Sequence, residues 1–156
     1  MLLRTRLRHR GLERALARYA WTGEYGRIWI ALALAGAAVD RPRRARWLRA
    51  GAGVPVTLAL NYCVKRLVGR RRPRLDGIDP TGPVPRSLSF PSAHAATSFA
   101  AAALLGALCR PLRVPLHVAA AVMAFSRPYL GVHYPSDVLA GAAVGALIGR
   151  ALGRLG

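Results

Sequence analysis

Apolar stretches alternate with short basic connections along the 156 residues of this chain. A helix of about 18 residues rises about 27 Å, close to the thickness of the hydrocarbon core of a bilayer. Apolar stretches of this length with cationic connections are typical of membrane proteins whose loops lie at lipid headgroups. The pattern therefore predicts an all-α fold, a polytopic membrane helical bundle of about five transmembrane helices. The predicted spans cover about residues 24–39, 47–64, 92–109, 114–126 and 136–152.

The fourth predicted span is shorter than the others and contains a histidine, His117. A span of this length must extend into its flanks or lie in a thinner, protein-buried position. Exposure of a polar side chain to lipid is costly. We therefore expect His117 to hydrogen-bond to a neighbouring helix rather than to take part in catalysis.

Residues 1–21 show a different pattern, with apolar residues on one helical face and arginines on the other. The apolar positions at helical spacing are Leu12, Ala15, Leu16 and Tyr19. This pattern is typical of a basic amphipathic helix that lies on an anionic membrane surface. We predict such an interfacial helix over 1–21, separate from a membrane unit over 22–156. A solvated basic tail is the alternative.

The last predicted span carries a glycine at every fourth position, and these glycines share one face of a helix. They are Gly141, Gly145, Gly149 and Gly153. A row of glycines lets another backbone approach closely. We expect this face to pack within the chain, and the alternative is a homo-oligomer seam.

The chain is strongly basic, with a net charge of +18, yet 53% of its residues are hydrophobic. A basic soluble protein usually binds nucleic acid. Here the arginines gather in short runs between the apolar spans instead of covering a surface. The sequence therefore predicts a lipid bilayer as the partner and no nucleic acid.

Two polar segments interrupt the apolar pattern, over residues 65–94 and 126–137. The first contains five prolines and is too irregular to cross lipid. The two spans that lie between the segments form a hairpin, so both segments emerge on the same side of the membrane. The topology thus brings two loops with reactive side chains to one surface.

These loops carry cations, histidines and a carboxylate that suit phosphoryl transfer. The transition state of that reaction is stabilised by fixed donors and cations. Pro91-Ser92 also reads as a helix start, whose free N–H groups at Ala93 and His94 would face an anion. Because the sequence offers no acidic cluster for Mg²⁺, the histidines would carry the covalent and proton-transfer steps.

Three motifs in these loops resemble the type 2 phosphatidic acid phosphatase superfamily. "KRLVGRRRP" has the form K-x6-R-P, "PSAH" the form P-S-x-H, and "SRPYLGVHYPSD" the form S-R-x5-H-x3-D. The superfamily includes membrane lipid phosphatases, and vanadium haloperoxidases share its site. The resemblance covers about residues 47–152, and it makes 22–156 a transmembrane phosphatase domain.

The resemblance implies roles for the matched residues. His133 would attack phosphorus and form a phosphohistidine, and Asp137 would bond its other ring nitrogen. His94 would protonate the leaving oxygen and then deprotonate the attacking water. The groups that would hold the phosphate oxygens are Lys65, Arg72, the Ser92 hydroxyl, the Ala93 N–H and Arg127. No metal and no cofactor is expected.

The resemblance also implies the reaction, a metal-independent hydrolysis of a phosphate monoester or diphosphate on a membrane lipid. The expected substrate is polyprenyl-linked, either decaprenylphosphoryl-phosphoribose or undecaprenyl diphosphate, which would place the protein in cell wall biosynthesis. A glycerolipid phosphatase that acts on phosphatidic acid or phosphatidylglycerol phosphate is the alternative. Two further alternatives are a vanadate-dependent haloperoxidase and a non-enzymatic membrane protein that binds anionic lipids.

The expected location is the inner (plasma) membrane, crossed several times. The side that carries the motifs has more basic residues than the other, even without the three proposed phosphate-binding cations. By the positive-inside rule this favours a cytoplasmic active site. The remaining basic residues of the first loop are expected to bind lipid phosphates or to set the topology. They are Arg66, Arg70, Arg71 and Arg74, and no pattern assigns a role to Asp76 or Asp79.

Overall fold

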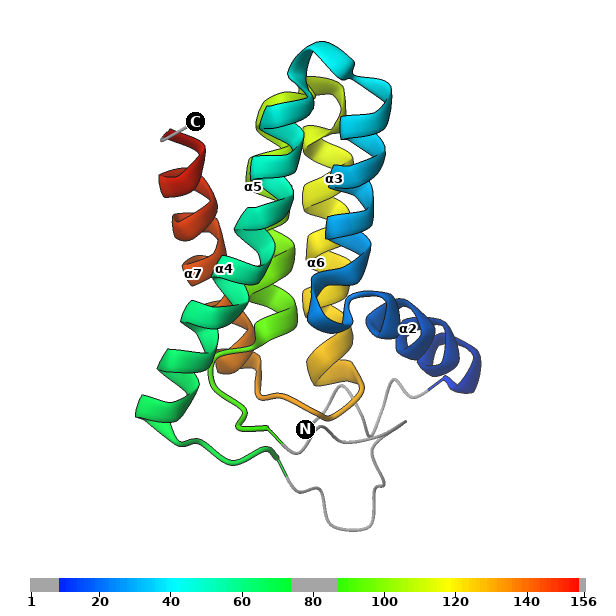
Figure 1. The fold of residues 1–156 in the computed structure, drawn as a ribbon. Helices are drawn as coiled ribbons and strands as arrows, with labels where there is room; N and C mark the ends of the chain where they lie inside the picture. The colour runs from blue at the N-terminus through cyan, green and yellow to red at the C-terminus, as the bar shows by residue number, and fades with distance from the viewer. Residues whose placement is uncertain (1–8, 74–86, 155–156) are drawn as a thin grey trace.

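The computed structural model describes residues 9–73 and 87–154, and within these ranges the regular structure is entirely helical. Five helices run along one bundle, preceded by a further helix, α2 (Arg10–Thr22) (Figure 1). The bundle helices are α3 (Arg27–Val39), α4 (Arg44–Val68), α5 (Ala93–Leu108), α6 (Arg113–Tyr129) and α7 (Pro135–Arg154). Short 3-10 helices at Glu24–Gly26, Arg41–Arg43 and Arg110–Leu112 lead into α3, α4 and α6. The prediction of an all-α fold is confirmed.

The bundle helices follow the predicted apolar stretches with shifted ends. The first begins at Arg27 rather than residue 24, because Glu24–Gly26 forms a separate turn. The fourth extends into both flanks, as its short apolar stretch requires. Among the described helices, α7 is long and apolar enough to cross a membrane, and α5 is apolar but shorter.

Helix α5 forms the centre of the bundle and packs against α4, α6 and α7. Its sequence is rich in alanine, so neighbouring backbones can lie close to it. The glycine face of α7 uses this property. A Cβ at Gly145 would collide with the Ala96 carbonyl, and a Cβ at Gly149 would lie 2.7 Å from the Ala100 carbonyl. The glycine face is thus covered by α5 of the same chain, and a homo-oligomer seam through it has no support.

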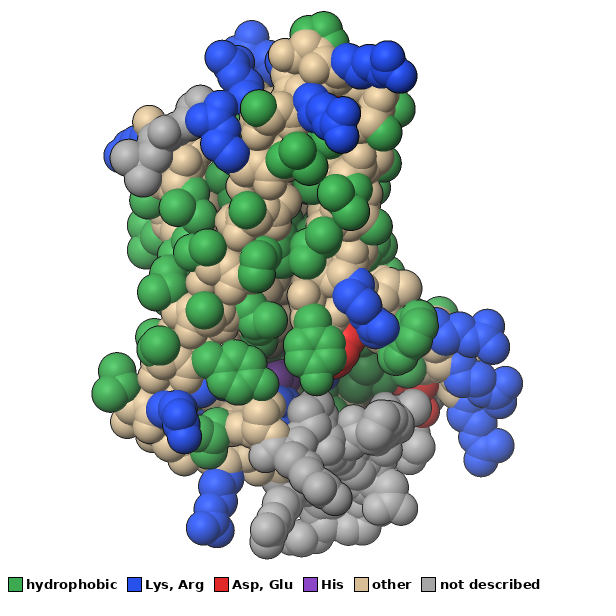
Figure 2. All heavy atoms as spheres, viewed as in Figure 1, with side chains coloured by type: hydrophobic (Ala, Val, Ile, Leu, Met, Phe, Trp, Pro, Cys, Tyr) green, Lys and Arg blue, Asp and Glu red, His purple; other side chains and the backbone are tan. Residues whose placement is uncertain are grey.

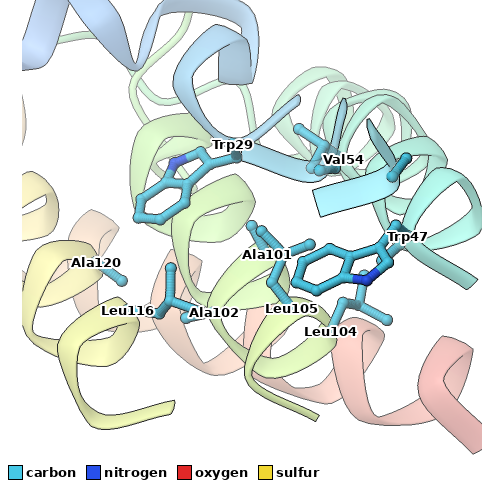
Figure 3. Close-up of a cluster of buried hydrophobic side chains, with 12 residues drawn as sticks. Trp29, Trp47, Val54, Ala101, Ala102, Leu104, Leu105, Leu116 and Ala120 are labelled. Carbon is cyan, nitrogen blue, oxygen red and sulfur yellow. The ribbon is translucent and has the colours of Figure 1, made fainter. Parts of the chain in front are cut away.

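Two tryptophans fasten α3 and α4 to this centre. Figure 3 shows Trp29 and Trp47 on either side of Ala101 and Leu105 of α5. The Trp29 Nε1–H donates to the Ser98 hydroxyl of α5 at 2.9 Å, so its buried polar group is satisfied. These contacts hold α3 and α4 against α5.

Helix α2 lies across the end of the bundle, at a steep angle to the other helices (Figure 1). Its apolar residues Leu16 and Ala20 are buried, whereas Leu12 on the same predicted face is 44% exposed. The Tyr19 hydroxyl donates to the Ala119 carbonyl of α6 at 2.9 Å. Residues 1–8, which complete the predicted helix, lie outside the described residues.

The expected hydrogen bond from His117 to a neighbouring helix is wrong. Its Nδ1 lies 2.7 Å from the Arg113 carbonyl, one turn earlier in the same helix. The carbonyl can only accept, so the hydrogen bond lies within α6 instead of joining two helices. The ring reaches α5 through an edge-to-face contact with Phe99. Phe99 of α5 is thus an aromatic neighbour of His117, while the imidazole N–H donates to a carbonyl of its own helix.

The connections α4–α5 and α6–α7 meet at the same end of the bundle, together with the α2–α3 turn (Figure 1). Backbone hydrogen bonds join them: Ser89 N–H donates to the Arg70 carbonyl, and Ser92 N–H donates to the Asp137 carbonyl. The described parts of both polar segments therefore lie at one end of the bundle, as predicted for a shared side. Arg74, Asp76 and Asp79 lie outside the described residues.

Candidate active site

His133 and Asp137 form a buried pair where α7 begins. Asp137 lies in the first turn of α7, and its Oδ2 is 3.4 Å from His133 Nδ1. Neither side chain is more than 2% exposed. Asp137 Oδ2 also accepts from the Tyr134 N–H at 2.9 Å and from the Ser89 hydroxyl. Its Oδ1 accepts from Arg70 Nη1 at 2.9 Å. These donors fix the carboxylate in one orientation toward the imidazole.

The other ring nitrogen of His133 faces Arg72. The Arg72 Nη1 lies 2.9 Å from His133 Nε2 and 2.8 Å from the Val132 carbonyl. Arginine only donates, so Nε2 accepts and carries no proton. The proton of the neutral ring is therefore on Nδ1, directed toward Asp137. This tautomer leaves the Nε2 lone pair available to an electrophile once Arg72 turns to another acceptor.

Burial lowers the pKa of His133 to about 4, although its hydrogen bond to Asp137 opposes that shift. The neighbouring cations Arg72, Arg127 and Lys65 lower the pKa further. At neutral pH the imidazole is therefore uncharged. A neutral ring with a free lone pair is the form that a nucleophile needs.

His94 lies in the first turn of α5, two residues after the cap residue Ser92. The Ser92 hydroxyl accepts the Ala95 N–H, as a helix N-cap does. The His94 Nε2 is 3.2 Å from the Ala20 carbonyl and 3.5 Å from Glu24 Oε2. Ala20 lies in the last turn of α2, and Glu24 lies in the turn between α2 and α3. His94 is thus held from outside the loops that carry the other motif residues.

Two buried cations, Lys65 and Arg127, and the half-buried Arg72 lie near the two histidines. Lys65 is 3% exposed, and its Nζ donates to the Leu88 carbonyl at 2.7 Å. Arg127 is 5% exposed, and its Nε has no hydrogen-bond partner among the described residues. Arg72 also donates to the Ser87 carbonyl at 2.8 Å. Cations gathered at one site repel one another, and an anion bound among them offsets this repulsion.

The two histidines line one cleft. Of the sequence-predicted residues, those on its wall are Lys65, Arg72, Ala93, His94 and His133. Asp137 lies behind His133, and neither Ser92 nor Arg127 is among the lining residues. Tyr25 and Tyr62 border the cleft and are 64% and 44% exposed. In Figure 2 a histidine is visible near the lower end of the bundle, between hydrophobic side chains.

Sequence reasoning missed several residues of this site. Arg70 was expected at lipid phosphates, but it bonds Asp137 and lies near the Phe90 and Tyr134 rings. Ser89 lies just before the P-S-x-H motif and contacts both Asp137 and His133. Glu24 belongs to the first predicted span. The chain has only six acidic residues, so the rarity of carboxylates could have marked Glu24 as a candidate site residue.

The arrangement has the parts of a two-step phosphoryl transfer: an oriented imidazole, a second imidazole, and cations around one cleft. The family whose sequence pattern matches is the PAP2 superfamily, over residues 46–155. The chain belongs to the PAP2 superfamily. The resemblance stated from the three motifs is confirmed, and the part of the chain before residue 46 lies outside the match.

Two PAP2 relatives are similar over most of the chain. A decaprenylphosphoryl-5-phosphoribose phosphatase of Mycobacterium tuberculosis is 47% identical over 86% of this chain and 75% of its own length. A protein of the same name from Mycolicibacterium smegmatis is 44% identical over 82% of this chain and 68% of its own. The predicted class, a phosphoric ester hydrolase of the PAP2 type, is confirmed.

The fold agrees with solved PAP2 structures. The crystal structure of Aquifex aeolicus LpxE superimposes with a TM-score of 0.79, at 22% identity, over 97% of this chain and 90% of that chain. The helical architecture is thus shared at low sequence identity.

Proposed function

We propose that this protein is a membrane lipid phosphatase that hydrolyses a polyprenyl-linked phosphate through a phosphohistidine on His133. One observation carries the proposal: the unprotonated Nε2 of His133 and the imidazole of His94 line one cleft with Lys65 and Arg72. Of the sequence-based alternatives, a haloperoxidase and a lipid-binding protein without activity have no such support from the named relatives.

The first step is the transfer of the phosphoryl group to His133. The Nε2 lone pair forms the new P–N bond while the bond from phosphorus to the leaving oxygen breaks. Asp137 stabilises the positive charge that develops on the ring, and it keeps the proton on Nδ1. His94 gives a proton to the leaving oxygen, so the lipid departs as an alcohol or as a phosphate with one group fewer.

The second step returns the enzyme to its starting form. A water molecule loses a proton to His94 and attacks the phosphohistidine, and the P–N bond breaks. Inorganic phosphate leaves, and His133 regains its lone pair. No residue beyond the two histidines has to exchange a proton in this cycle.

The phosphate oxygens bind to the cations and to the start of α5. Arg72 exchanges its contact with His133 for the phosphate, and Lys65 approaches from the same wall. The unpartnered Nε of Arg127 supplies a further donor. Ser92 contributes as the N-cap of α5. Ala93, the first residue of that helix, lines the cleft and offers its free N–H to the phosphate.

A lipid substrate fits the surroundings of the cleft. Tyr25 and Tyr62 at its border offer contact to a sugar or an apolar chain. The names of the two relatives point to decaprenylphosphoryl-5-phosphoribose as the substrate. Undecaprenyl diphosphate, phosphatidic acid and phosphatidylglycerol phosphate are the other lipids to compare.

The proposed setting is the plasma membrane, with α3 to α7 as five spans. Figure 2 shows the basic side chains of one face gathered at the two ends of the bundle, with hydrophobic side chains between them. Exposed apolar residues along the helices support this setting; they include Val39, Val114, Leu139 and Leu147. Helix α2, as part of the proposed interfacial helix 1–21, lies on the membrane surface beside the phosphatase domain 22–156. The excess of basic residues on the catalytic side favours a cytoplasmic site.

The test is a phosphate-release assay on purified protein in detergent and in vesicles, with a panel of polyprenyl and glycerolipid phosphates. We expect release that persists in EDTA, is blocked by vanadate and is abolished in His133→Ala. The matched control is His117→Ala, which removes a histidine outside the cleft. Full activity in His133→Ala overturns the proposed nucleophile, and a preference for glycerolipids overturns the proposed substrate.

A further inference from the structure

The turn between α2 and α3 forms one wall of the cleft. Gly23, Glu24, Tyr25 and Gly26 all line it, opposite Lys65, Arg72 and His133. This turn lies before residue 46, where the match to the PAP2 superfamily begins. It is therefore a part of the site that the three motifs do not include.

The turn has an unusual backbone. Tyr25 has φ 54°, in the left-handed region that residues other than glycine rarely adopt, and Gly26 follows with φ 74°. The Tyr25 side chain is 64% exposed, so burial of its ring does not explain the conformation. A strained non-glycine residue at a cleft points to a function for the segment that it shapes.

Two close contacts fix the turn against the bundle. A Cβ at Gly26 would collide with Val54 of α4. A Cβ at Gly23 would lie 2.6 Å from the Met123 side chain and 3.2 Å from Cδ2 of His94. The small size of these glycines lets the backbone of the turn lie next to the His94 ring.

The approach places a carboxylate beside His94. Glu24 Oε2 is 3.5 Å from His94 Nε2, and the Ala20 carbonyl is 3.2 Å from the same atom. A carbonyl only accepts, so Nε2 carries a proton. The cations Arg127 and Arg72 and the His133 imidazole also lie near His94. Glu24 is the acidic group that the described residues bring to this ring.

We propose that Glu24 is a positioning residue for the proton-transfer step: its carboxylate lies beside the Nε2–H of His94, which the Ala20 carbonyl accepts, and it stabilises the imidazolium form. The inference rests on the proposed phosphatase activity and deepens it. With Nε2–H donated to the Ala20 carbonyl, Nδ1 is the nitrogen that gives its proton to the leaving oxygen and later takes one from water. Glu24 itself keeps its charge throughout and gains no proton.

Leaving-group chemistry provides the test. An alkyl or isoprenoid oxygen must be protonated as it leaves, whereas the p-nitrophenolate of p-nitrophenyl phosphate leaves without a proton. The ratio kcat/KM reports the steps up to phosphorylation of His133. We measure it for wild type, Glu24→Gln, Glu24→Asp, His94→Ala and the double variant Glu24→Gln/His94→Ala, on a polyprenyl phosphate and on p-nitrophenyl phosphate.

In Glu24→Gln we expect kcat/KM on the lipid to fall about 10- to 100-fold, the range seen when a carboxylate that orients a histidine is removed. On p-nitrophenyl phosphate we expect a change within about threefold, because no proton is needed there. Glu24→Asp keeps the charge and restores part of the lipid activity. In the His94→Ala background, loss of the carboxylate adds little, because Glu24 acts through His94.

Equal losses on both substrates, or a full additional loss in the His94→Ala background, overturn the inference and assign Glu24 to folding or to lipid binding. A Glu24→Gln protein that equals wild type also overturns it, while the phosphatase activity stands. A wild-type protein that releases phosphate from neither substrate overturns the proposed function itself, which is a separate outcome.

Discussion

The two histidines of the cleft both lie beside a carboxylate, at nearly equal distances. His133 Nδ1 is 3.4 Å from Asp137, and His94 Nε2 is 3.5 Å from Glu24. Their surroundings differ. The Asp137 side chain is fully buried and accepts from Arg70, Ser89 and the Tyr134 N–H, whereas the Glu24 side chain is 38% exposed.

The difference matches the tasks proposed for the two rings. A nucleophile works in one tautomer, so a carboxylate locked by several donors is an advantage. An acid–base group must gain and lose a proton in each cycle, and it benefits from a partner that is less rigidly bound. The Asp137 side of the site is therefore built for orientation, and the Glu24 side for proton exchange.

The sharpest way to break this comparison is to remove the locked carboxylate. In Asp137→Asn we expect turnover to fall roughly 10³-fold or more, with a modest change in apparent affinity, because orientation of the nucleophile matters in the transition state. Steady-state kinetics on the lipid substrate measure it. Asp40→Asn, which removes a carboxylate bonded to Trp47, is the control and should keep its turnover. A change confined to affinity contradicts the orienting role.

The second variant removes the proton-exchanging ring. In His94→Ala we expect lipid turnover to fall about 10²- to 10⁴-fold, the usual contribution of general acid–base catalysis. With radiolabelled p-nitrophenyl phosphate, the variant should accumulate phosphohistidine, because the water that hydrolyses it lacks a base. Acid-labile, alkali-stable label on the protein is the measurement. Label that persists when His133 is also replaced places the phosphoryl group elsewhere.

A smaller effect is expected from Arg70→Gln. Arg70 Nη1 donates to both Asp137 Oδ1 and the Ser136 hydroxyl, so its loss frees one side of the locked carboxylate. Turnover should fall about tenfold, as for other groups that orient a catalytic partner. Arg71→Gln removes the same charge from the next, exposed residue and should have little effect. Equal losses in both variants would instead indicate attraction of anionic lipid.

The sequence predicted one side of this comparison better than the other. The helices follow from the apolar stretches, and the hairpin of α5 and α6 puts both motif loops at one end. The spacing of His133 and Asp137, four residues apart, already places them one turn from each other. Arg70 was missed because it stands in a run of arginines, and only a contact 67 residues away distinguishes it.

Glu24 could not be assigned from the pattern for a related reason. It belongs to an apolar stretch that reads as the start of a span, and its partner His94 lies 70 residues further along. The backbone at Tyr25 is left-handed, and a tyrosine in the sequence does not indicate such a conformation. His117 is the opposite case. A polar residue within a predicted span suggested a hydrogen bond to another helix, but the bond of His117 lies within α6.

The smallest expected effect concerns the protonation state of His133, which can be measured without substrate. Because burial lowers the pKa of His133 to about 4, its ring should stay neutral as the pH falls from 7 to 5 and gain a proton only near 4. The contact with Arg72 requires the proton to be on Nδ1. Nitrogen chemical shifts of ¹⁵N-histidine-labelled protein, with His133→Ala for assignment, report both properties. A ring that protonates above pH 6, or one with its proton on Nε2, contradicts the proposed nucleophile, since the attacking lone pair is then absent.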